Sequence, residues 1–244
     1  MTADPARPIV YLGPSLPVAD ARRLLDADYR PPVRRGDLPS HHAGPVVVID
    51  GDFHQDLPVS PNELLRLLDA GTPVLGAASM GALRAAELDR YGMRGCGWVY
   101  DAYRSGRVVA DDEVAVAYVR GEDHPLTVPL VNVRFWLEEL VGAGVADPAL
   151  AARLLRRARS VFYADRSERL LLRLWEQAVG RETVRALLAA SGGAITDVKA
   201  ADARLVLAAA RSAARQGGES RWTLDDGTAT PRSAPAWPRS SAGR

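Results

Sequence analysis

The stretch TPVLGAASMGALRAAEL, residues 72–88, decides the fold of this chain. Its first half is a continuous apolar run that follows Pro73, which is typical of a short strand buried on both faces. Its second half carries Met80, Leu83 and Ala86 at helical spacing. The pattern therefore predicts a buried strand that runs directly into a helix, with Ser79 at the sharp junction between them.

Two similar units precede this stretch. Residues 8–12 and 45–50 are apolar strands by the same pattern, and residues 18–26 have helical spacing. A further helix begins after Ser60, because the sequence Ser-Pro-Asn-Glu matches a capping box with proline in the first turn. Continuous apolar strands that alternate with helices indicate a parallel sheet covered on both faces. Ligands bind such sheets at the carboxyl ends of the strands.

The second half of the chain has a helical pattern throughout. Apolar residues repeat at helical spacing in four segments between residues 130 and 190, with predicted caps at Asp147 and Asp165. Thr196 is the predicted cap of a fifth helix, which places Lys199 in the first turn of that helix.

The predicted fold class is α/β: a mostly parallel sheet with flanking helices, followed by a C-terminal all-helical part. We expect an α/β core over residues 1–125 and a helical part packed on the core over residues 126–215. Gly, Ser, Pro, Arg and Thr dominate residues 216–244 without periodicity, so this segment is expected to be a disordered tail. Residues 114–118 are predicted to form a further strand of the core.

Composition excludes several classes of function. The 31 basic and 30 acidic residues leave a formal net charge of +1, which gives no case for nucleic-acid binding. No apolar run approaches the roughly 18 residues of a membrane span, and no signal sequence is evident, so we expect a cytoplasmic protein that does not bind membranes. Cys96 is the single cysteine, so it is expected to be a packed small residue rather than a nucleophile.

Neither a metal site nor a bound cofactor is predicted. The carboxylates of Asp111–Glu113 are expected on a solvated strand edge, because no histidine lies near them at ligand spacing. His41, His42 and His54 lie in predicted loops without a supporting motif. The glycine-rich loops that hold phosphate groups are missing from the sequence, so nucleotide binding by such a loop is not expected.

Ser79 and Lys199 form the candidate catalytic pair. Lys199 is the only lysine among the 31 basic residues, and lysine can lose its proton when buried, whereas arginine stays charged. A serine hydroxyl needs such a base before it acts as a nucleophile. Two other interpretations remain open from the residues alone: a serine that only caps the helix at Ser79, and a lysine on a solvated face without a role at Lys199.

A tetrahedral intermediate also needs backbone amides aimed at its oxyanion. The sequence Ala77-Ala78-Ser79-Met80-Gly81 is similar to the Gly-x-Ser-x-Gly elbow of hydrolases, with Ala77 in place of the first glycine. The candidates for oxyanion or substrate binding are Gly13, Ser15, Met80, Gly81, Arg84 and Arg134. The two arginines would add positive potential that lowers the pKa of a nearby lysine.

Several motifs together resemble the TfuA-like proteins, which are partners of YcaO enzymes in peptide backbone thioamidation. They are LGPSLP at 12–17, IDGDF at 49–53, residues 76–88, YGM at 91–93, DDEVAV at 111–116 and VNVR at 131–134. The resemblance is close over residues 10–135 and looser from there to residue 205, a segment that includes Lys199. One departure lies at Ser60-Pro61-Asn62-Glu63, where many relatives are expected to have His-Lys-Glu: Glu63 is kept, and the two residues before it are not.

The resemblance implies a function in the biosynthesis of modified peptides. A Ser-Lys hydrolase of this kind would release sulfide from the C-terminal thiocarboxylate of a ThiS-type sulfur-carrier protein, with Ser79 as nucleophile and Lys199 as base. The YcaO partner would use the sulfide and ATP, so this chain itself would bind no cofactor. The implied partners are a YcaO enzyme, the sulfur carrier and a precursor peptide.

Two other functions remain open at this point. The chain can be a non-catalytic docking subunit that binds a YcaO enzyme and its peptide substrate, with Ser79 and Arg84 in structural roles. It can also be an amidase or esterase that acts on small molecules unrelated to peptides.

Overall fold

The computed structural model of the chain describes residues 7–52, 58–122 and 124–215. Within them, five parallel strands form one sheet in the order β2-β1-β3-β4-β5. The strands are β1 (Ile9–Tyr11), β2 (Asp28–Arg30), β3 (Val46–Val48), β4 (Val74–Gly76) and β5 (Arg94–Gly95). The predicted α/β class and the parallel sheet are therefore confirmed. The tail predicted over 216–244 lies outside the described residues.

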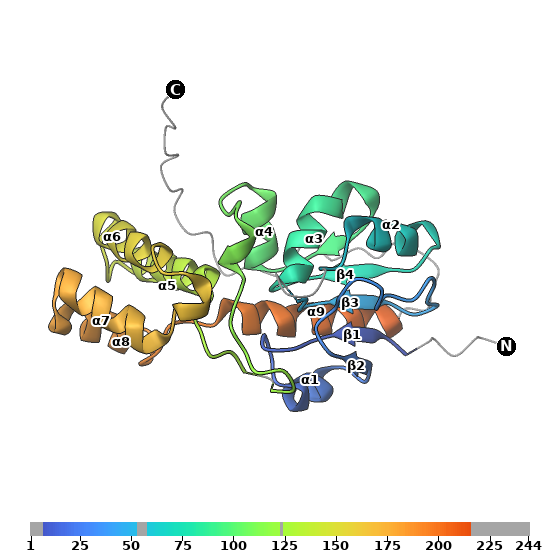
Figure 1. Cartoon of the computed structure of the whole chain (residues 1–244), viewed down its shortest axis with the longest axis horizontal. Coiled ribbons are helices and arrows are strands. Elements are labelled where there is room, and N and C mark those ends of the chain that lie inside the picture. The colour runs from blue at the N-terminus through green and yellow to red at the C-terminus, as the bar shows by residue number, and fades with distance from the viewer. Residues whose placement is uncertain (1–6, 53–57, 123, 216–244) are drawn as a thin grey trace, which may run out of the picture.

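Helices cover both faces of the sheet, as the apolar strands predict (Figure 1). One face packs against α2 (Pro61–Asp69), α3 (Met80–Leu88) and α4 (Trp98–Arg104). The other packs against α1 (Val18–Leu24) and α9 (Val198–Arg215). Alternate strand residues serve the two faces: Ile9, Tyr11, Val46 and Val48 belong to the first core, and Val10, Leu12, Val47 and Ile49 to the second.

The remaining helices build a core of their own. They are α5 (Leu130–Gly142), α6 (Pro148–Arg159), α7 (Glu168–Val179) and α8 (Arg181–Ala190). Trp136 of α5 and Trp175 of α7 stack at its centre, with ring centroids 5.5 Å apart. Figure 1 shows α6, α7 and α8 gathered at the end of the molecule away from the N-terminus. The chain then returns through α9, whose buried residues Ala203, Val206 and Leu207 pack on the sheet.

Most predicted helix starts are confirmed, and two shift by one or two residues. Ser60 and Asp147 cap their helices as predicted. Ser167, not Asp165, caps α7, because Asp165 is the last residue of the short 3-10 turn Tyr163–Asp165. Asp197, not Thr196, caps α9: its Oδ1 accepts the Ala200 N–H at 3.0 Å. Lys199 nevertheless lies in the first turn of α9, as predicted.

The strand predicted over residues 114–118 is wrong. Asp111–Glu113 form a 3-10 turn, and the segment after it is irregular apart from an isolated bridge between Tyr118 and Pro125. Glu113 and Val114 are buried there without pairing to the sheet, so apolar character in this segment reflects packing between loops and helices. The described helices contain no stretch with both the length and the hydropathy of a transmembrane span.

Candidate functional site

The turn from β4 into α3 is the most constrained backbone of the site. Ala78 has a φ of +66°, and it is the single non-glycine residue with positive φ among those described. The Ser79 N–H donates to the Ala77 carbonyl at 2.8 Å, which closes a three-residue turn around Ala78. A left-handed alanine costs about 1–2 kcal/mol. The chain therefore holds Ser79 at the start of α3 against a local preference for a different backbone.

The Ser79 side chain does not cap α3. Ser79 occupies the N-cap position and is 3% exposed, but its hydroxyl makes no hydrogen bond to the helix. Ser60 and Ser167, by contrast, accept backbone N–H groups from the third helical residue of α2 and α7. The interpretation of Ser79 as a simple capping residue is wrong. The Ser79 hydroxyl makes no hydrogen bond with the described residues, so it is available for other chemistry.

Three glycines allow the start of α3 to pack closely against the ends of the strands. A Cβ on Gly81 would lie 1.8 Å from the Val48 carbonyl oxygen, and one on Gly76 would lie 2.2 Å from the Gly81 oxygen. A Cβ on Gly51 would lie 2.7 Å from Cγ of Met80. Only glycine permits such close backbone approach. The three glycines thus place the first turn of α3 directly over the carboxyl ends of β3 and β4.

The backbone amides around the site differ in their partners. The Gly81 N–H donates to the Ile49 carbonyl at 3.2 Å. The Met80 N–H has no hydrogen-bond acceptor among the described residues, as expected for the first residue of a helix. This amide directly follows Ser79, which is the position of an oxyanion-hole amide in a nucleophile elbow.

The amides of Gly13 and Ser15, which were the other candidates for oxyanion binding, both donate to Asp50. Its carboxylate accepts the Gly13 N–H at 2.9 Å, the Ser15 N–H at 3.1 Å and the Ser15 hydroxyl at 2.6 Å. Asp50 is 2% exposed and directly follows the Val46–Ile49 run at the end of β3. Gly13 and Ser15 therefore lie at the predicted edge of the sheet, but Asp50 already holds both of their amides. The sequence places Asp50 at this edge, directly after an apolar strand, but gives no sign that its carboxylate binds these two amides.

Lys199 is buried, so the interpretation of a solvated surface lysine is wrong. It is 3% exposed, and its Nζ donates to the Val114 carbonyl at 2.9 Å. Burial lowers the pKa of Lys199, while the carboxylates of Asp50 and Asp197 act in the opposite direction. The net shift is toward the neutral amine, which is the form that can accept a proton.

The residues that flank Ser79 and Lys199 belong to the same two buried clusters. Ala78 and Ala200, which flank the two residues, belong to one buried cluster, and Met80 and Val198 on their other sides belong to a second. The helix α9 contacts both β3 and β4. Asp50, at the end of β3, acts on the pKa of Lys199, so the lysine amine lies near the carboxyl edge of the sheet. Ser79 follows the neighbouring strand β4 at the same edge.

The two candidate arginines are engaged elsewhere. Arg84 donates to the Val59 carbonyl at 3.1 Å and to Glu87 at 2.7 Å. Arg134 makes two parallel bonds, of 2.5 and 2.8 Å, to the carboxylate of Glu113. Glu113 is 2% exposed, so the prediction of a solvated acidic edge is wrong for this residue. Among the described residues, no group of three or more His, Cys, Asp or Glu side chains could hold a metal ion.

Asp202 connects α9, the helix that contains Lys199, to the start of α4. One turn after Lys199, its carboxylate accepts the Trp98 N–H at 3.0 Å and the Val99 N–H at 2.8 Å. Burial raises the pKa of Asp202 to about 7. Burial also raises the pKa of the nearby Cys96 thiol to about 12, so Cys96 stays protonated at neutral pH, in line with the prediction that it is not a nucleophile.

The raised pKa of Asp202 predicts a pH-dependent stability. Between about pH 4, the ordinary aspartate range, and about pH 7, the folded state binds more protons at this site than the unfolded state. The free energy of unfolding therefore falls as pH rises through this window. Between pH 5 and pH 8, wild type is expected to lose about 2–3 kcal/mol more than Asp202→Asn. Urea denaturation of both proteins at the two pH values measures this difference, and parallel losses would contradict it.

Comparison with known families adds one match. Residues 50–167 match the family model described as TfuA-like protein. This region contains Ser79, Glu113 and Arg134, and it ends before Lys199. No curated protein matches the chain.

Proposed function

Because this chain belongs to the TfuA-like family, whose members are associated with YcaO enzymes in an accessory role in thioamidation, we propose that it is a hydrolase that supplies sulfide for that reaction. Its substrate is the C-terminal thiocarboxylate of a small ThiS-type sulfur-carrier protein. Ser79 is the nucleophile and Lys199 is the base. Sulfide passes to the YcaO partner, which modifies a precursor peptide.

One observation carries this proposal: a buried serine with no capping bond stands at a strained strand-to-helix turn, directly before the open Met80 amide. The buried lysine supports it, because its amine lies near Asp50 at the end of the neighbouring strand β3. Ser79 and Met80 follow β4 at the carboxyl edge of the sheet, and the Lys199 amine is close enough to Asp50, at the end of β3, for that carboxylate to act on its pKa. A helix cap would need only the serine. The combination instead supplies the nucleophile, oxyanion donor and base that acyl transfer requires.

The reaction follows from these three groups in two steps. In the first, the neutral amine of Lys199 takes the Ser79 proton, and the serine oxygen attacks the thiocarboxylate carbon while the Met80 N–H holds the oxyanion. The carbon–sulfur bond then breaks, and Lys199 returns the proton to sulfur, so that HS⁻ leaves and a Ser79 ester remains. In the second step, Lys199 takes a proton from water, and the hydroxide attacks the ester carbon. The carbon–oxygen bond to Ser79 then breaks, the Lys199 ammonium returns its proton to the Ser79 oxygen, and the carrier leaves as a carboxylic acid that loses its proton to solvent.

Sulfide release from a thiocarboxylated carrier tests the proposal. Ser79→Ala is expected to lower the rate roughly 1,000-fold or more, because removal of a nucleophile leaves only the contribution of binding and the oxyanion hole. Ser167→Ala, which removes the N-cap of α7, is the matched control and is expected to retain the rate. Full activity of a folded Ser79→Ala protein would overturn the hydrolase proposal.

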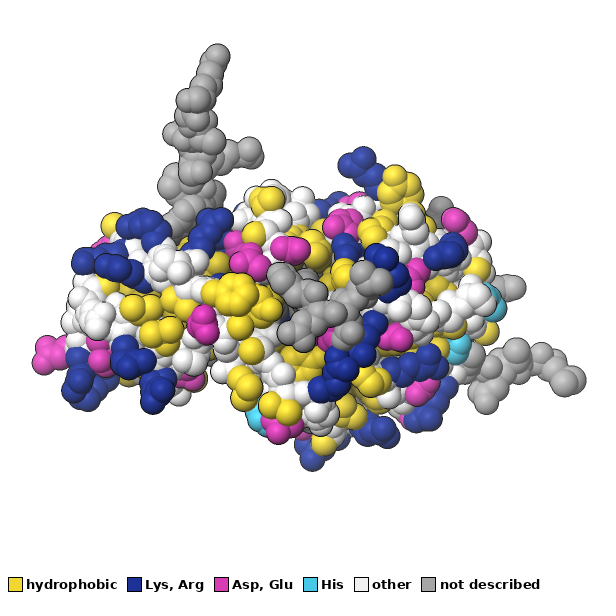
Figure 2. All heavy atoms as spheres, viewed as in Figure 1, with side chains coloured by type: hydrophobic (Ala, Val, Ile, Leu, Met, Phe, Trp, Pro, Cys, Tyr) yellow, Lys and Arg dark blue, Asp and Glu magenta, His cyan; other side chains and the backbone are white. Residues whose placement is uncertain are grey.

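A non-catalytic docking role is the second candidate, and the surface of α6 favours it. Arg153, Arg156, Arg157 and Arg159 are exposed and make no ion pair with the described residues. Three of them and Ser160 line a hollow of about 410 Å³. Figure 2 shows basic side chains, all of them arginines, over the end of the molecule where α6, α7 and α8 lie. Such a surface suits an acidic segment of a YcaO partner. Unchanged sulfide release in Ser79→Ala would leave docking as the better account.

A further inference from the structure

Two neighbouring segments hold Lys199 in place. Its Nζ donates to the Val114 carbonyl at 2.9 Å, and its backbone N–H donates to Asn132 Oδ1 at 3.3 Å. Asn132 Nδ2 in turn donates to Asp197, the cap of α9, at 3.0 Å. The start of α9 is thus bound to α5, and the end of the lysine side chain is bound to the turn that contains Val114.

That turn is itself attached to α5. Glu113 directly precedes Val114, and the two guanidinium bonds from Arg134 hold the Glu113 carboxylate at 2.5 and 2.8 Å. The Glu113 side chain is 3% exposed and that of Arg134 is 18% exposed, so this is a largely buried bidentate pair. Asn132 and Arg134 lie two residues apart and point to different sides of α5. One side of the helix therefore fixes the backbone of Lys199, and another fixes the acceptor of its amine.

We propose that the Arg134–Glu113 ion pair is a positioning device for Lys199. The pair fixes the Val114 carbonyl, the carbonyl occupies one N–H bond of the lysine amine, and the lone pair of that amine is thereby directed for proton transfer. Arg134 acts through two intermediates and touches no reacting atom, so it is a positioning residue. The inference rests on the proposed role of Lys199 as the base.

The charges around Lys199 give the direction of the expected effect. Asp50 at the end of β3 and Asp197 at the start of α9 both stabilise the ammonium form. Glu113, one residue from the Val114 acceptor, carries a third carboxylate that Arg134 neutralises. Removal of the guanidinium leaves that charge unpaired and frees the amine to move toward a carboxylate. Both consequences favour the protonated form and raise the pKa of Lys199.

Because Lys199 is the only lysine, its titration can be followed directly. Full-length protein grown with lysine labelled with ¹³C at the ε-carbon gives one side-chain signal by NMR. Arg134→Met is expected to raise the apparent pKa of this signal by about one unit or more, toward the 10.4 of ordinary lysine. The rising limb of the pH profile for sulfide release should move by the same amount. Release at a pH below this limb should therefore fall about tenfold.

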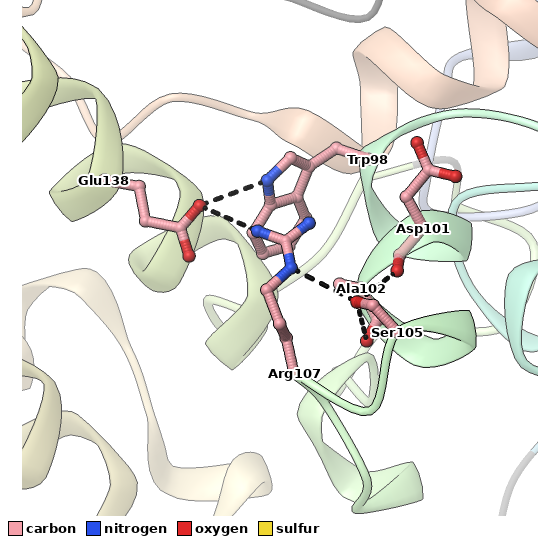
Figure 3. A network of polar contacts seen from close by, with 6 residues as sticks. All are labelled: Trp98, Asp101, Ala102, Ser105, Arg107 and Glu138. Carbon is pink, nitrogen blue, oxygen red and sulfur yellow. Dashed lines mark hydrogen bonds and ion pairs between the residues drawn. The ribbon is translucent and has the colours of Figure 1, made fainter. Parts of the chain in front are cut away.

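Arg134→Lys and Arg107→Met complete the experiment. A lysine at position 134 keeps the charge but cannot form both parallel bonds, so its effect should have the same direction and a smaller size. If Arg134→Met does not fold, the Arg134→Lys protein decides the question, and its Lys199 pKa is expected to rise by about half a unit. Arg107 pairs with Glu138, one turn beyond Arg134 on α5, at 3.2 Å and lies over the Trp98 ring (Figure 3). Arg107→Met breaks this neighbouring pair and should leave the Lys199 pKa unchanged.

The outcomes separate this inference from the proposed function. An unchanged Lys199 signal in folded Arg134 variants, or an equal shift in Arg107→Met, would overturn the positioning role. A shifted Lys199 signal in the Arg134 variants, together with no sulfide release by the wild-type protein, would sustain the positioning role and refute the hydrolase. Shifts in both the signal and the pH profile support the two together.

Discussion

Lys199→Arg is expected to reduce sulfide release roughly 1,000-fold or more, to the level of a protein without a base. The replacement puts a permanent positive charge at this position, and in most surface positions it would be harmless. At this position the side chain is 3% exposed, and burial lowers the pKa of the lysine. Arginine remains protonated at every pH at which the protein is folded, so it cannot take the proton from Ser79. The assay is sulfide release from a thiocarboxylated carrier between pH 6 and 9.

Lys199→Met separates loss of the base from loss of the fold. Methionine has a similar length, carries no charge and removes the penalty of burying an ammonium group. It leaves the Val114 carbonyl without its donor, which costs about 1–3 kcal/mol. The unfolding free energy should therefore stay within a few kcal/mol of wild type, while release should fall as in Lys199→Arg. A folded, fully active Lys199→Met protein would show that another group acts as the base.

Gly81→Ala is expected to have the largest effect on stability of any single methyl addition at the site. The new Cβ would lie 1.8 Å from the Val48 carbonyl oxygen and 2.6 Å from its carbon. Both are backbone atoms of a buried strand, so neither can move aside as a flexible side chain would. The helix α3 must shift from the sheet, at a cost of about 3 kcal/mol or more from a total stability of about 5–15 kcal/mol.

The same shift should also reduce activity. Gly81 lies two residues after Ser79, so its displacement moves the hydroxyl and the Met80 amide together. Misplacement by about 1 Å can cost about 100-fold in rate. Gly142→Ala is the matched control, because a Cβ there meets nothing within 4 Å and the residue ends α5. Alanine in a helix is favoured over glycine by about 0.5–1 kcal/mol, so this variant should be as stable as wild type or more so. Equal melting temperatures for the two variants would contradict the close approach of α3 to β3.

Short elements were the hardest to predict. The strand β5 contains two residues, which is too few for a pattern to stand out, and the three residues of β2 lack the apolar run that marks β1, β3 and β4. The residues of β2 are only half-buried, so their polar side chains resemble those of a loop. The seven-residue helix α4 follows Gly97, whose φ is +93° and whose N-cap position has no side chain to signal a start. Its cap is Asp202, more than 100 positions later.

The sequence by itself determined the local features of the site: the strand-to-helix turn at Ser79, the single lysine and its place in the first turn of α9. These features depend on residue type and short-range spacing, which can be read directly from the sequence. Tertiary structure decided the rest. Lys199 is buried, the amides of Gly13 and Ser15 donate to Asp50, and Arg134 forms an ion pair with Glu113. A pKa and a hydrogen-bond partner depend on which distant side chains come within a few ångströms, and packing alone settles that.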